Sequence, residues 1–405
     1  MSDLKPGCKR IAIFLDGTWN TLWDNTNVWR LKSLCIQNDK QVVYYSKGVG
    51  TQIGKKIIGG ALGYGIDQEV IDAYEWLIEN YNEDDRLYLF GFSRGAYTAR
   101  SLSGLIAKCG LLRPGAPLSV KQLYDRYQKG GKGNEATPRT MLALKRVQEN
   151  DGLGQLEPEE RRMLKYCHIV PIRFLGVWDT VGSLGISFSG IPKISSESYQ
   201  FLETDLRISN YKAYHALAID EHREKFAPTL WTKPKESAYP DRKIEDVEQR
   251  WFVGAHANVG GGYPGDLLAQ RPLQWLMSKA IKDGLEFREK SDIDVEIDGY
   301  ISSAEIKDSY AEFLGGIYKF LPFSKRYYRA IGGLPLVTKE SEESETINET
   351  IDWSVFDRWH NNESYRPQNI SDWADNHGVT IDSLITKDQP QNAVNAKFPN
   401  LVVPD

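Results

Sequence analysis

The sequence predicts an α/β fold in which a mostly parallel central sheet is flanked by helices, with inserted segments forming a cap. Short apolar runs recur along the chain, each is followed by glycine or polar residues, and an amphipathic helical pattern separates the first two runs. Strands that alternate with helices build parallel sheets covered on both faces. With 405 residues, of which 41% are hydrophobic, the chain can also bury a sizeable core.

Four apolar runs are predicted to be strands that are buried on both faces of the sheet. They span residues 10–15 (RIAIFL), 86–90 (RLYLF), 171–178 (PIRFLGVW) and 250–253 (RWFV), and residues 42–45 (VVYY) form a further candidate strand. Continuous apolar runs of this length are typical of parallel sheets, although periodicity alone does not exclude buried helix. Polar or reactive side chains follow each of the four runs. In open parallel sheets these carboxyl ends meet at one edge, where functional groups gather.

Helical patterns occupy the segments between these runs. Residues 66–81 (IDQEVIDAYEWLIENY) place their apolar side chains on one helical face, and residues 96–109 are predicted to be a second helix. The stretch 211–223 (YKAYHALAIDEHR) is interpreted as helical. We expect residues 1–290 to form one α/β catalytic unit, with helical insertions around 111–165 and 190–245, and residues 291–405 to form a C-terminal extension that packs on this unit or caps it.

The composition narrows the class of protein. The net charge is −5, which argues against a nucleic-acid binder, because such proteins usually show a basic surplus. The four cysteines are widely spaced, so neither a disulfide framework nor a zinc site is predicted. Residues 1–10 lack an apolar signal-peptide core, and no run of about 18 apolar residues occurs. We therefore expect synthesis as a cytoplasmic protein, with export by a route that reads no Sec signal left open.

The pentapeptide at residues 91–95 (GFSRG) has the Gly-x-Ser-x-Gly pattern of a nucleophile elbow. On its own this pattern is weak, but a predicted strand precedes it and a predicted helix follows it, as the elbow of an α/β-hydrolase-like fold requires. The glycines leave room for a sharp turn that exposes the Ser93 hydroxyl above the sheet. The alternative is a serine that merely caps its helix. We interpret Ser93 as a catalytic nucleophile.

A nucleophilic serine needs a base and an acid that orients the base. In α/β-hydrolases the chain order is Ser, then Asp or Glu, then His. Asp179 and His256 follow the third and fourth predicted strands, and they fit this order. The other histidines precede a strand, lie in the helix-like stretch or belong to the polar C-terminal part. They are His168, His215, His222, His360 and His377. The sequence thus predicts a triad of Ser93, Asp179 and His256.

Two backbone N–H groups are candidates for an oxyanion hole. Arg94 begins the helix after the nucleophile, and Gly17 lies in the loop after the first strand. We expect the Asp16 side chain to play a structural role next to Gly17. A glycine-rich stretch at residues 48–56 superficially resembles a phosphate-binding loop, but Val49 and Lys56 occupy positions that need Gly and Ser or Thr. We interpret residues 48–65 as a loop near the mouth of the site.

Six motifs occur in an order that resembles a known family. They are DGTWN (16–20), GVGT (48–51), GFSRGAYTAR (91–100), GVWDTVGS (176–183), HALAIDEHR (215–223) and GAHANVGGGY (254–263). Together they resemble a large family of α/β-hydrolase-like proteins that includes phospholipase effectors of bacterial type VI secretion. A weaker match, IDWSVFDRW at 351–359 followed by YRP, lies near the C-terminus.

The resemblance implies that the family's catalytic triad falls on Ser93, Asp179 and His256. It also implies hydrolysis of carboxylic esters, with phospholipids as the substrate class of the toxin branch and an immunity or adaptor protein as a partner. No metal ion or other cofactor is required. Family members usually have Asp two residues after the histidine, where this chain has Asn258, which keeps the shape and one acceptor but loses the charge.

Two alternatives to a lipase or phospholipase remain open. One is a non-catalytic protein that binds a ligand on a hydrolase scaffold, because a fold does not guarantee its chemistry. The other is a hydrolase of a different acyl bond, because the same triad serves many substrates. Residues 310–331, rich in aromatic and aliphatic side chains, are expected to pack in the core or between domains. Peripheral contact with a bilayer is the second interpretation of this segment.

Overall fold

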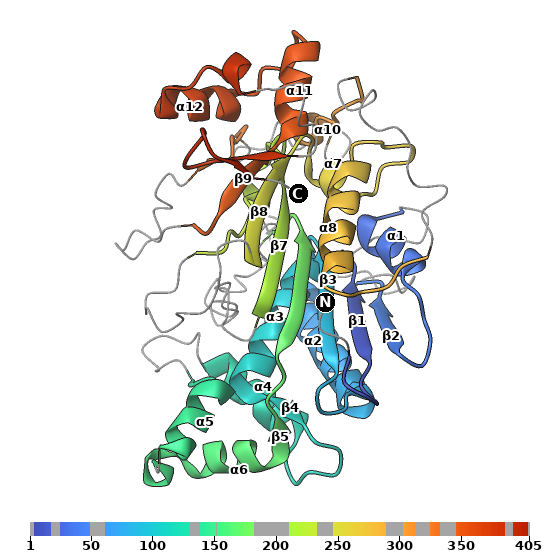
Figure 1. The fold of residues 1–405 in the computed structure, drawn as a ribbon, viewed down its shortest axis with the longest axis vertical. Coiled ribbons are helices and arrows are strands. Elements are labelled where there is room, and N and C mark those ends of the chain that lie inside the picture. Colours follow the sequence, from blue (N-terminus) through green and yellow to red (C-terminus); the bar gives the residue numbers. More distant parts are fainter. Residues whose placement is uncertain are drawn as a thin grey trace.

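Nine strands form one sheet within the part of the chain that the structure describes. In this computed structural model the strand order is β11-β10-β9-β8-β7-β6-β3-β1-β2. The pairings from β2 to β9 are parallel, whereas β10 and β11 pair antiparallel at one end. The described residues are 4–17, 25–48, 61–129, 138–150, 152–181, 210–232, 246–288, 303–312, 325–332, 346–384 and 392–403. Figure 1 shows the sheet running through the middle of the molecule, with helices on both sides.

The five strands predicted from apolar runs are present, which confirms the mostly parallel α/β fold. Their bounds are Arg10–Leu15 (β1), Gln41–Ser46 (β2), Arg86–Phe92 (β3), Ile172–Trp178 (β6) and Val247–Phe252 (β8). The side chains of β3 and β8 are buried on both faces along almost their whole length. Burial on both faces explains why these strands appear in the sequence as continuous apolar runs.

The helical interpretation of residues 211–223 is wrong. Residues Asn210–Ala218 form strand β7, which lies between β6 and β8 in the centre of the sheet. A central strand has no polar face, so it lacks the alternation that distinguishes a strand from a helix. The helical insertion expected around residues 190–245 therefore contains a strand of the main sheet.

Helices cover the two faces of the sheet in separate layers. On one face lie α2 (Ala61–Asn80) and α3 (Arg94–Cys109), and on the other lie α1 (Asn27–Leu34) and α8 (Gln270–Lys282). The pleat of β1 divides its side chains accordingly: Ile11, Ile13 and Leu15 join the core with α2 and α3, while Ala12 and Phe14 join the core with α1 and α8. Each layer thus buries one face of the same strands.

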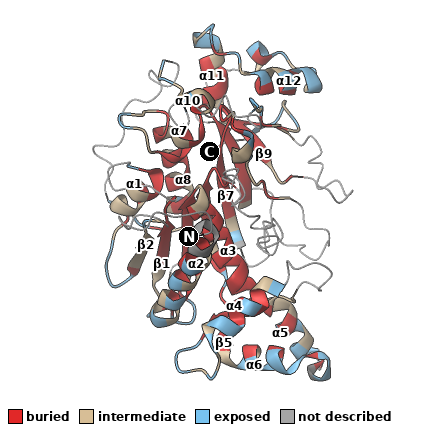
Figure 2. Cartoon of the chain, turned by 180° about the vertical axis from the view of Figure 1, so that it is seen from behind, coloured by how far each residue is buried: buried red, intermediate tan, exposed pale blue. Residues whose placement is uncertain are grey.

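The described residues between 111 and 168 form a small, mainly helical region at one end of α3. It contains β4 (Leu111–Leu112), α4 (Val120–Lys129), α5 (Met141–Glu149), η1 (Leu153–Gln155), α6 (Pro158–Tyr166) and β5 (Cys167–His168). Figure 2 shows that α4, α5 and α6 each bury only part of their surface, whereas central strands of the main sheet such as β3 and β8 are buried along almost their whole length.

Residues beyond 290 extend the sheet as well as packing on it. Strands β9 (Glu349–Asp352), β10 (Ala393–Asn395) and β11 (Val402–Val403) continue the sheet from β8. Helices α11 (Trp353–Asn361) and α12 (Gln368–His377) and the short η8 (Ile381–Ser383) bury a third apolar core against these strands. Figure 1 shows α11 and α12 at the opposite end of the molecule from α5 and α6.

The aromatic segment 310–331 lies partly outside the described residues. Its described parts are the end of α10 (Ser309–Glu312) and most of the segment 325–332, which contains no helix or strand. No described helix is both long and apolar enough to cross a membrane.

Candidate active site

Ser93 lies at the sharp turn between strand β3 and helix α3. Its backbone has φ 57° and ψ −121°, a conformation that costs energy for a residue other than glycine. The flanking glycines permit the turn. A Cβ on Gly91 would lie 2.6 Å from the carbonyl carbon of Gly95, and a Cβ on Gly95 would lie 2.5 Å from the Asp16 carbonyl oxygen. This geometry is that of a nucleophile elbow, as the pentapeptide predicts.

The structure brings Ser93, His256 and Asp179 together in one chain of hydrogen bonds. The Nε2 atom of His256 lies 2.8 Å from Ser93 Oγ, and its Nδ1 atom lies 2.6 Å from Asp179 Oδ2. Because a carboxylate only accepts hydrogen bonds, Nδ1 carries the proton of the imidazole. Nε2 is then left to accept the proton of the serine hydroxyl. This is the arrangement in which a histidine serves as the base for a serine.

Parallel pairing sets the spacing between the three residues. The Ser93 N–H donates to Trp178 O at the end of β6, and the Asp179 N–H donates to Ala216 O in β7. Ser93 and Asp179 therefore emerge from neighbouring strands, at the carboxyl edge where functional groups gather in such sheets. His256 begins the short helix α7 (His256–Gly260) after β8 and reaches back to Ser93.

Asp179 is fully buried and is held by four donors. The Ala218 N–H and the Nη1 atom of Arg329 donate to Oδ1, while Arg329 Nη2 and the His256 ring donate to Oδ2. Burial alone would raise the pKa of the Asp179 carboxyl, but the positive charge of Arg329 and the hydrogen bond from His256 outweigh it and hold the pKa well below its usual value. The carboxylate is thus ionised whenever its partners are in place.

Aromatic rings enclose the imidazole of His256. The ring of Phe92 lies 4.7 Å from it between centroids, and the ring of Phe226, in the short helix η4 (Glu224–Phe226), lies 5.2 Å away with an edge contact. His256 is 7% exposed. This enclosure limits the access of water to the imidazole and strengthens its hydrogen bonds.

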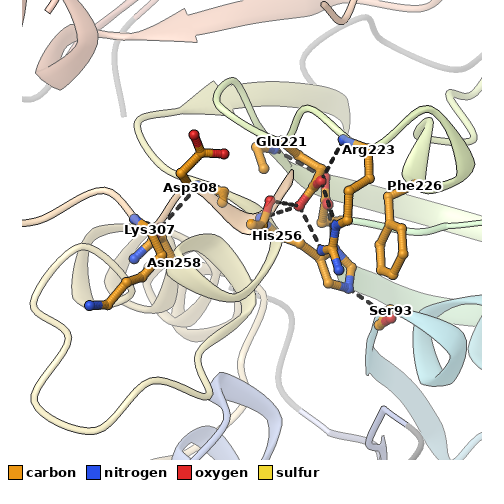
Figure 3. A network of polar contacts seen from close by, with 12 residues as sticks. Ser93, Glu221, Arg223, Phe226, His256, Asn258, Lys307 and Asp308 are labelled. Carbon is orange, nitrogen blue, oxygen red and sulfur yellow. Dashed lines mark hydrogen bonds and ion pairs between the residues drawn. The ribbon is translucent and has the colours of Figure 1, made fainter. Parts of the chain in front are cut away.

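A buried ion pair supports the backbone at His256. The carboxylate of Glu221 accepts hydrogen bonds from the Arg223 side chain, from the Ser309 hydroxyl and from the His256 N–H. Figure 3 shows the His256 ring directed at Ser93, with Glu221, Arg223 and Phe226 gathered around it. Burial opposes ionisation of Glu221, but the hydrogen bonds and charge of Arg223 outweigh it and lower the pKa of Glu221 to about 2.

Neither His215 nor His168 is placed to act as the base for Ser93. His215 is fully buried in β7, and its Nε2 accepts a hydrogen bond from the Thr180 N–H. Burial and the nearby Arg100 lower the pKa of His215 to about 3, so this ring is neutral and supports the loop after Asp179. His168 lines a cavity of about 430 Å³ with Tyr81 and Arg113. That cavity lies at the amino ends of β3 and β6, away from Ser93.

The expected donor role of Gly17 needs correction. Its N–H donates to the Oδ1 atom of Asp16 at 2.7 Å, so it points at that carboxylate and not at Ser93. Asp16 also accepts hydrogen bonds from the hydroxyls of Thr26 and Tyr45, which ties the loop after β1 to α1 and β2. The Arg94 N–H, by contrast, lies in the first residue of α3. A helix N-terminus at this place favours a developing negative charge beside Ser93.

Asn258 lies two residues after His256 and connects three backbone segments. Its Oδ1 atom accepts hydrogen bonds from the N–H groups of Ala255 and Lys307, and its Nδ2 atom donates to Asp266. The amide caps the start of α7 and pairs with a carboxylate that an Asp at this position would repel.

A match to a protein-family model covers residues 9–279, about two thirds of the chain. The family is described as the catalytic domain of the type VI secretion phospholipase effectors that are similar to Tle1. The chain belongs to this family. The match includes all three residues of the hydrogen-bonded chain, while residues 280–405 lie outside it.

Similar proteins and solved structures come from bacteria and yeast. This Tle1-like chain is 26% identical over 247 residues to an uncharacterised protein of Saccharomyces cerevisiae, with 55% of this chain and 33% of that protein covered. The chain thus spans about a third of the length of this relative. An uncharacterised protein of Pseudomonas aeruginosa is 16% identical with a TM-score of 0.40, over 78% of this chain and 51% of that one. A Tle1 effector bound to the VgrG spike is 21% identical with a TM-score of 0.30, over 65% and 53%.

Sequence reasoning missed the charged residues around Ser93, His256 and Asp179. Arg329 lies within the aromatic segment 310–331, and Glu221 and Arg223 lie within the stretch interpreted as helical and the motif HALAIDEHR, but no role at the site is predicted for any of the three. Glu221 and Arg223 follow an apolar run closely. Once that run is recognised as a strand, this position indicates residues at the carboxyl edge of the sheet, where functional groups gather. No comparable signal marks Arg329. Within the described ranges, no group of three or more His, Cys, Asp or Glu side chains is placed to hold a metal ion.

Proposed function

We propose that this protein is a serine ester hydrolase of the phospholipase A or lipase type. The observation that carries the proposal is the hydrogen-bonded chain from Ser93 Oγ through His256 to Asp179, with a strained nucleophile backbone at its start. An elbow that stores strain, a base within 2.8 Å and a buried acid behind it together fit acyl transfer. Membership of a phospholipase effector family points to the ester bonds of phospholipids.

The first half-reaction in this proposal transfers the acyl group to the enzyme. The Nε2 atom of His256 takes the proton of the Ser93 hydroxyl as Oγ attacks the acyl carbonyl carbon. The negative charge that forms on the carbonyl oxygen is stabilised by the Arg94 N–H at the start of α3. His256 then gives its proton to the leaving alcohol as the ester C–O bond breaks. An acyl ester of Ser93 remains.

The second half-reaction releases the fatty acid. His256 removes a proton from a water molecule, and the oxygen of this water attacks the acyl carbon of the Ser93 ester. The proton on His256 returns to Ser93 Oγ as that bond breaks. During both steps Asp179 keeps Nδ1 protonated and stabilises the imidazolium, because its own carboxyl stays ionised.

A fluorophosphonate probe tests the nucleophile directly. We expect the wild-type protein to be labelled on Ser93 and the Ser93→Ala variant to remain unlabelled. Ser101→Ala is the matched control, because Ser101 is a buried serine of the helix that follows Ser93, and its hydroxyl donates to Tyr97 O. This control is expected to be labelled like the wild type. Equal labelling of the wild type and Ser93→Ala would rule out Ser93 as the nucleophile.

A lipid panel with product identification tests the reaction. Purified wild-type protein is expected to release fatty acid and lysophospholipid from phospholipid vesicles, as measured by mass spectrometry, while Ser93→Ala releases neither. Retention of a lipid without turnover would favour a ligand-binding protein on a hydrolase scaffold. Turnover of other acyl esters or amides, with phospholipids untouched, would reassign the substrate class.

Delivery by a type VI secretion system is a further part of the proposal, based on the family to which the chain belongs. A spike, adaptor or immunity protein would then be a partner. Co-purification of the tagged chain with VgrG-type and neighbouring gene products tests this. The absence of any stable complex with them would oppose it.

A further inference from the structure

Arg329 is a buried arginine whose guanidinium group faces the catalytic acid. Its side chain has no exposed surface, and it belongs to the segment 325–332, outside the residues matched by the family model. Nη1 donates to Asp179 Oδ1 at 2.6 Å and Nη2 donates to Oδ2 at 3.0 Å. The same two nitrogens donate to the carbonyl oxygens of Ala218 and Phe226. Four acceptors from three segments therefore fix the guanidinium plane.

This arrangement fixes the orientation of the Asp179 carboxylate as well as that of the Arg329 guanidinium. A bidentate guanidinium holds both oxygens of a carboxylate in one plane, which a single N–H donor does not. Asp179 itself has a backbone φ of 38°, an uncommon conformation for a residue other than glycine. The oxygen that accepts from His256 Nδ1 also accepts from Arg329 Nη2. The direction of the catalytic hydrogen bond therefore depends on Arg329.

We propose that Arg329 is a positioning residue of the active site, which orients Asp179 toward His256 and balances its negative charge. This inference rests on the proposed function, because it assigns a role within the Ser93–His256–Asp179 triad. It assigns a residue of the segment 325–332 to the active site, although the match to the family's catalytic domain ends at residue 279. Arg329 acts through Asp179 and not on the substrate.

The charges around the imidazole determine how this role appears in the pH dependence of the reaction. The titratable and charged groups that face His256 and Asp179 are Ser93, His215, Glu221, Arg223 and Arg329. Glu221 and Arg223 form a pair of opposite charges, and Asp179 and Arg329 form a second. Removal of Arg329 leaves one uncompensated negative charge, which favours the imidazolium form of His256.

The sign of the expected shift follows from this imbalance. Hydrolysis needs a neutral His256, so any change that favours the imidazolium moves the acid limb of kcat/KM to higher pH. We expect Arg329→Met to move this limb upward by about one pH unit, the lower end of the range for a neighbouring charge. We also expect kcat to fall by about 10²-fold with little change in KM, because a freed Asp179 no longer holds the imidazole in place.

Arg329→Lys separates the charge from the geometry. A lysine keeps the positive charge but does not reproduce the planar pair of donors. We expect its acid limb to stay within about 0.3 pH units of the wild type, while its kcat falls about 10-fold. It also provides a second variant if Arg329→Met is too unstable to purify.

Two matched controls separate positioning from general stability. Arg250 is equally buried and pairs with Glu248 and Asp352 in the same sheet, and Arg326 is partly exposed on the same segment and pairs with Asp308. Arg250→Met is expected to lower the melting temperature without moving the acid limb, and Arg326→Met is expected to change neither.

The outcomes distinguish this inference from the proposed function. A wild-type protein that is neither labelled by the fluorophosphonate nor active on lipids overturns both. A labelled, active wild type whose Arg329→Met variant keeps the wild-type acid limb and kcat overturns the role of Arg329 alone. A melting-temperature loss in Arg329→Met like that of Arg250→Met, again with an unmoved acid limb, makes Arg329 merely structural. An acid limb of kcat/KM that moves to higher pH in Arg329→Met but not in Arg329→Lys supports the proposal.

Discussion

Replacing Glu69 with Gln tests how a buried carboxyl near the turn at Ser93 titrates. Glu69 lies in α2, and its two oxygens accept hydrogen bonds from Ser46 at the end of β2 and from Thr98 in α3. Burial raises the pKa of Glu69 to about 7, although both hydroxyls and the charge of Arg94 oppose the change. The folded protein therefore keeps a proton on this carboxyl across a pH range in which the unfolded chain releases it.

The difference in the pKa of Glu69 between the folded and the unfolded state sets the size and sign of the change in the free energy of unfolding. A rise in pKa from 4.5 to about 7 corresponds to about 3 kcal/mol, at about 1.4 kcal/mol per pH unit. Because the folded state binds more protons than the unfolded state between these values, the free energy of unfolding falls as the pH rises through them. A glutamine keeps the shape and one acceptor but never ionises. We expect the free energy of unfolding of Glu69→Gln to exceed that of the wild type by up to about 3 kcal/mol at pH 8, and to equal it at pH 4.

Urea unfolding followed by tryptophan fluorescence at pH 4, 6 and 8 measures the difference, because the chain contains 11 tryptophans. Glu75→Gln is the matched control, since Glu75 is exposed on the same helix. This control is expected to stay within about 0.5 kcal/mol of the wild type at every pH. A difference between Glu69→Gln and the wild type that is the same at pH 4 and pH 8 would refute the reasoning.

Three further predictions concern the site. Asp179→Asn leaves the buried guanidinium of Arg329 without a counter-charge, so we expect the free energy of unfolding, measured with urea, to fall by about 3–5 kcal/mol. The rate of lipid hydrolysis is expected to fall by about 10⁴-fold. An unchanged free energy of unfolding would argue against the ion pair. Gly95→Ala forces a Cβ against the β1 backbone, and a fluorophosphonate labelling rate reduced at least about 10-fold is expected; labelling at the wild-type rate would contradict this. Asn258→Asp places a second carboxylate beside Asp266, so a melting temperature below the wild type at pH 8, with recovery near pH 4, is expected; an equal deficit at both pH values would oppose it.

Five strands of the sheet, and the three residues Ser93, Asp179 and His256, could be predicted because their signals are local. Each of the runs before Asp16, Ser93 and Asp179 is apolar, short and followed by a turn residue. Parallel pairing then brings the strand ends to one edge without any further information. Strand β7 escaped prediction because both of its faces are buried from Ala213 to Ala218, so these residues show neither a period of two nor a polar face.

The support of Asp179 could not be predicted because it depends on pairing between distant parts of the chain. Arg329 is 150 residues from Asp179 and lies in a segment without helix or strand. An arginine that follows two tyrosines, as Arg329 does, resembles an interfacial anchor as much as a buried partner. Similarly, the N–H of Gly17 matched the expected place of an oxyanion donor, but the carboxylate of Asp16 next to it accepts that hydrogen bond.

The separation of 150 residues between Asp179 and Arg329 has a consequence for synthesis on the ribosome. At 5–20 residues per second, a nascent chain carries Asp179 for about 8–30 s before Arg329 has been added. During that interval the residues of β9 to β11 are also missing from the edge of the sheet. A product that ends between residues 257 and 328 would contain Ser93, Asp179 and His256, yet lack the Arg329 guanidinium that pairs with Asp179. The hydrogen bonds that hold both oxygens of Asp179 are therefore complete only after residue 329 has been added.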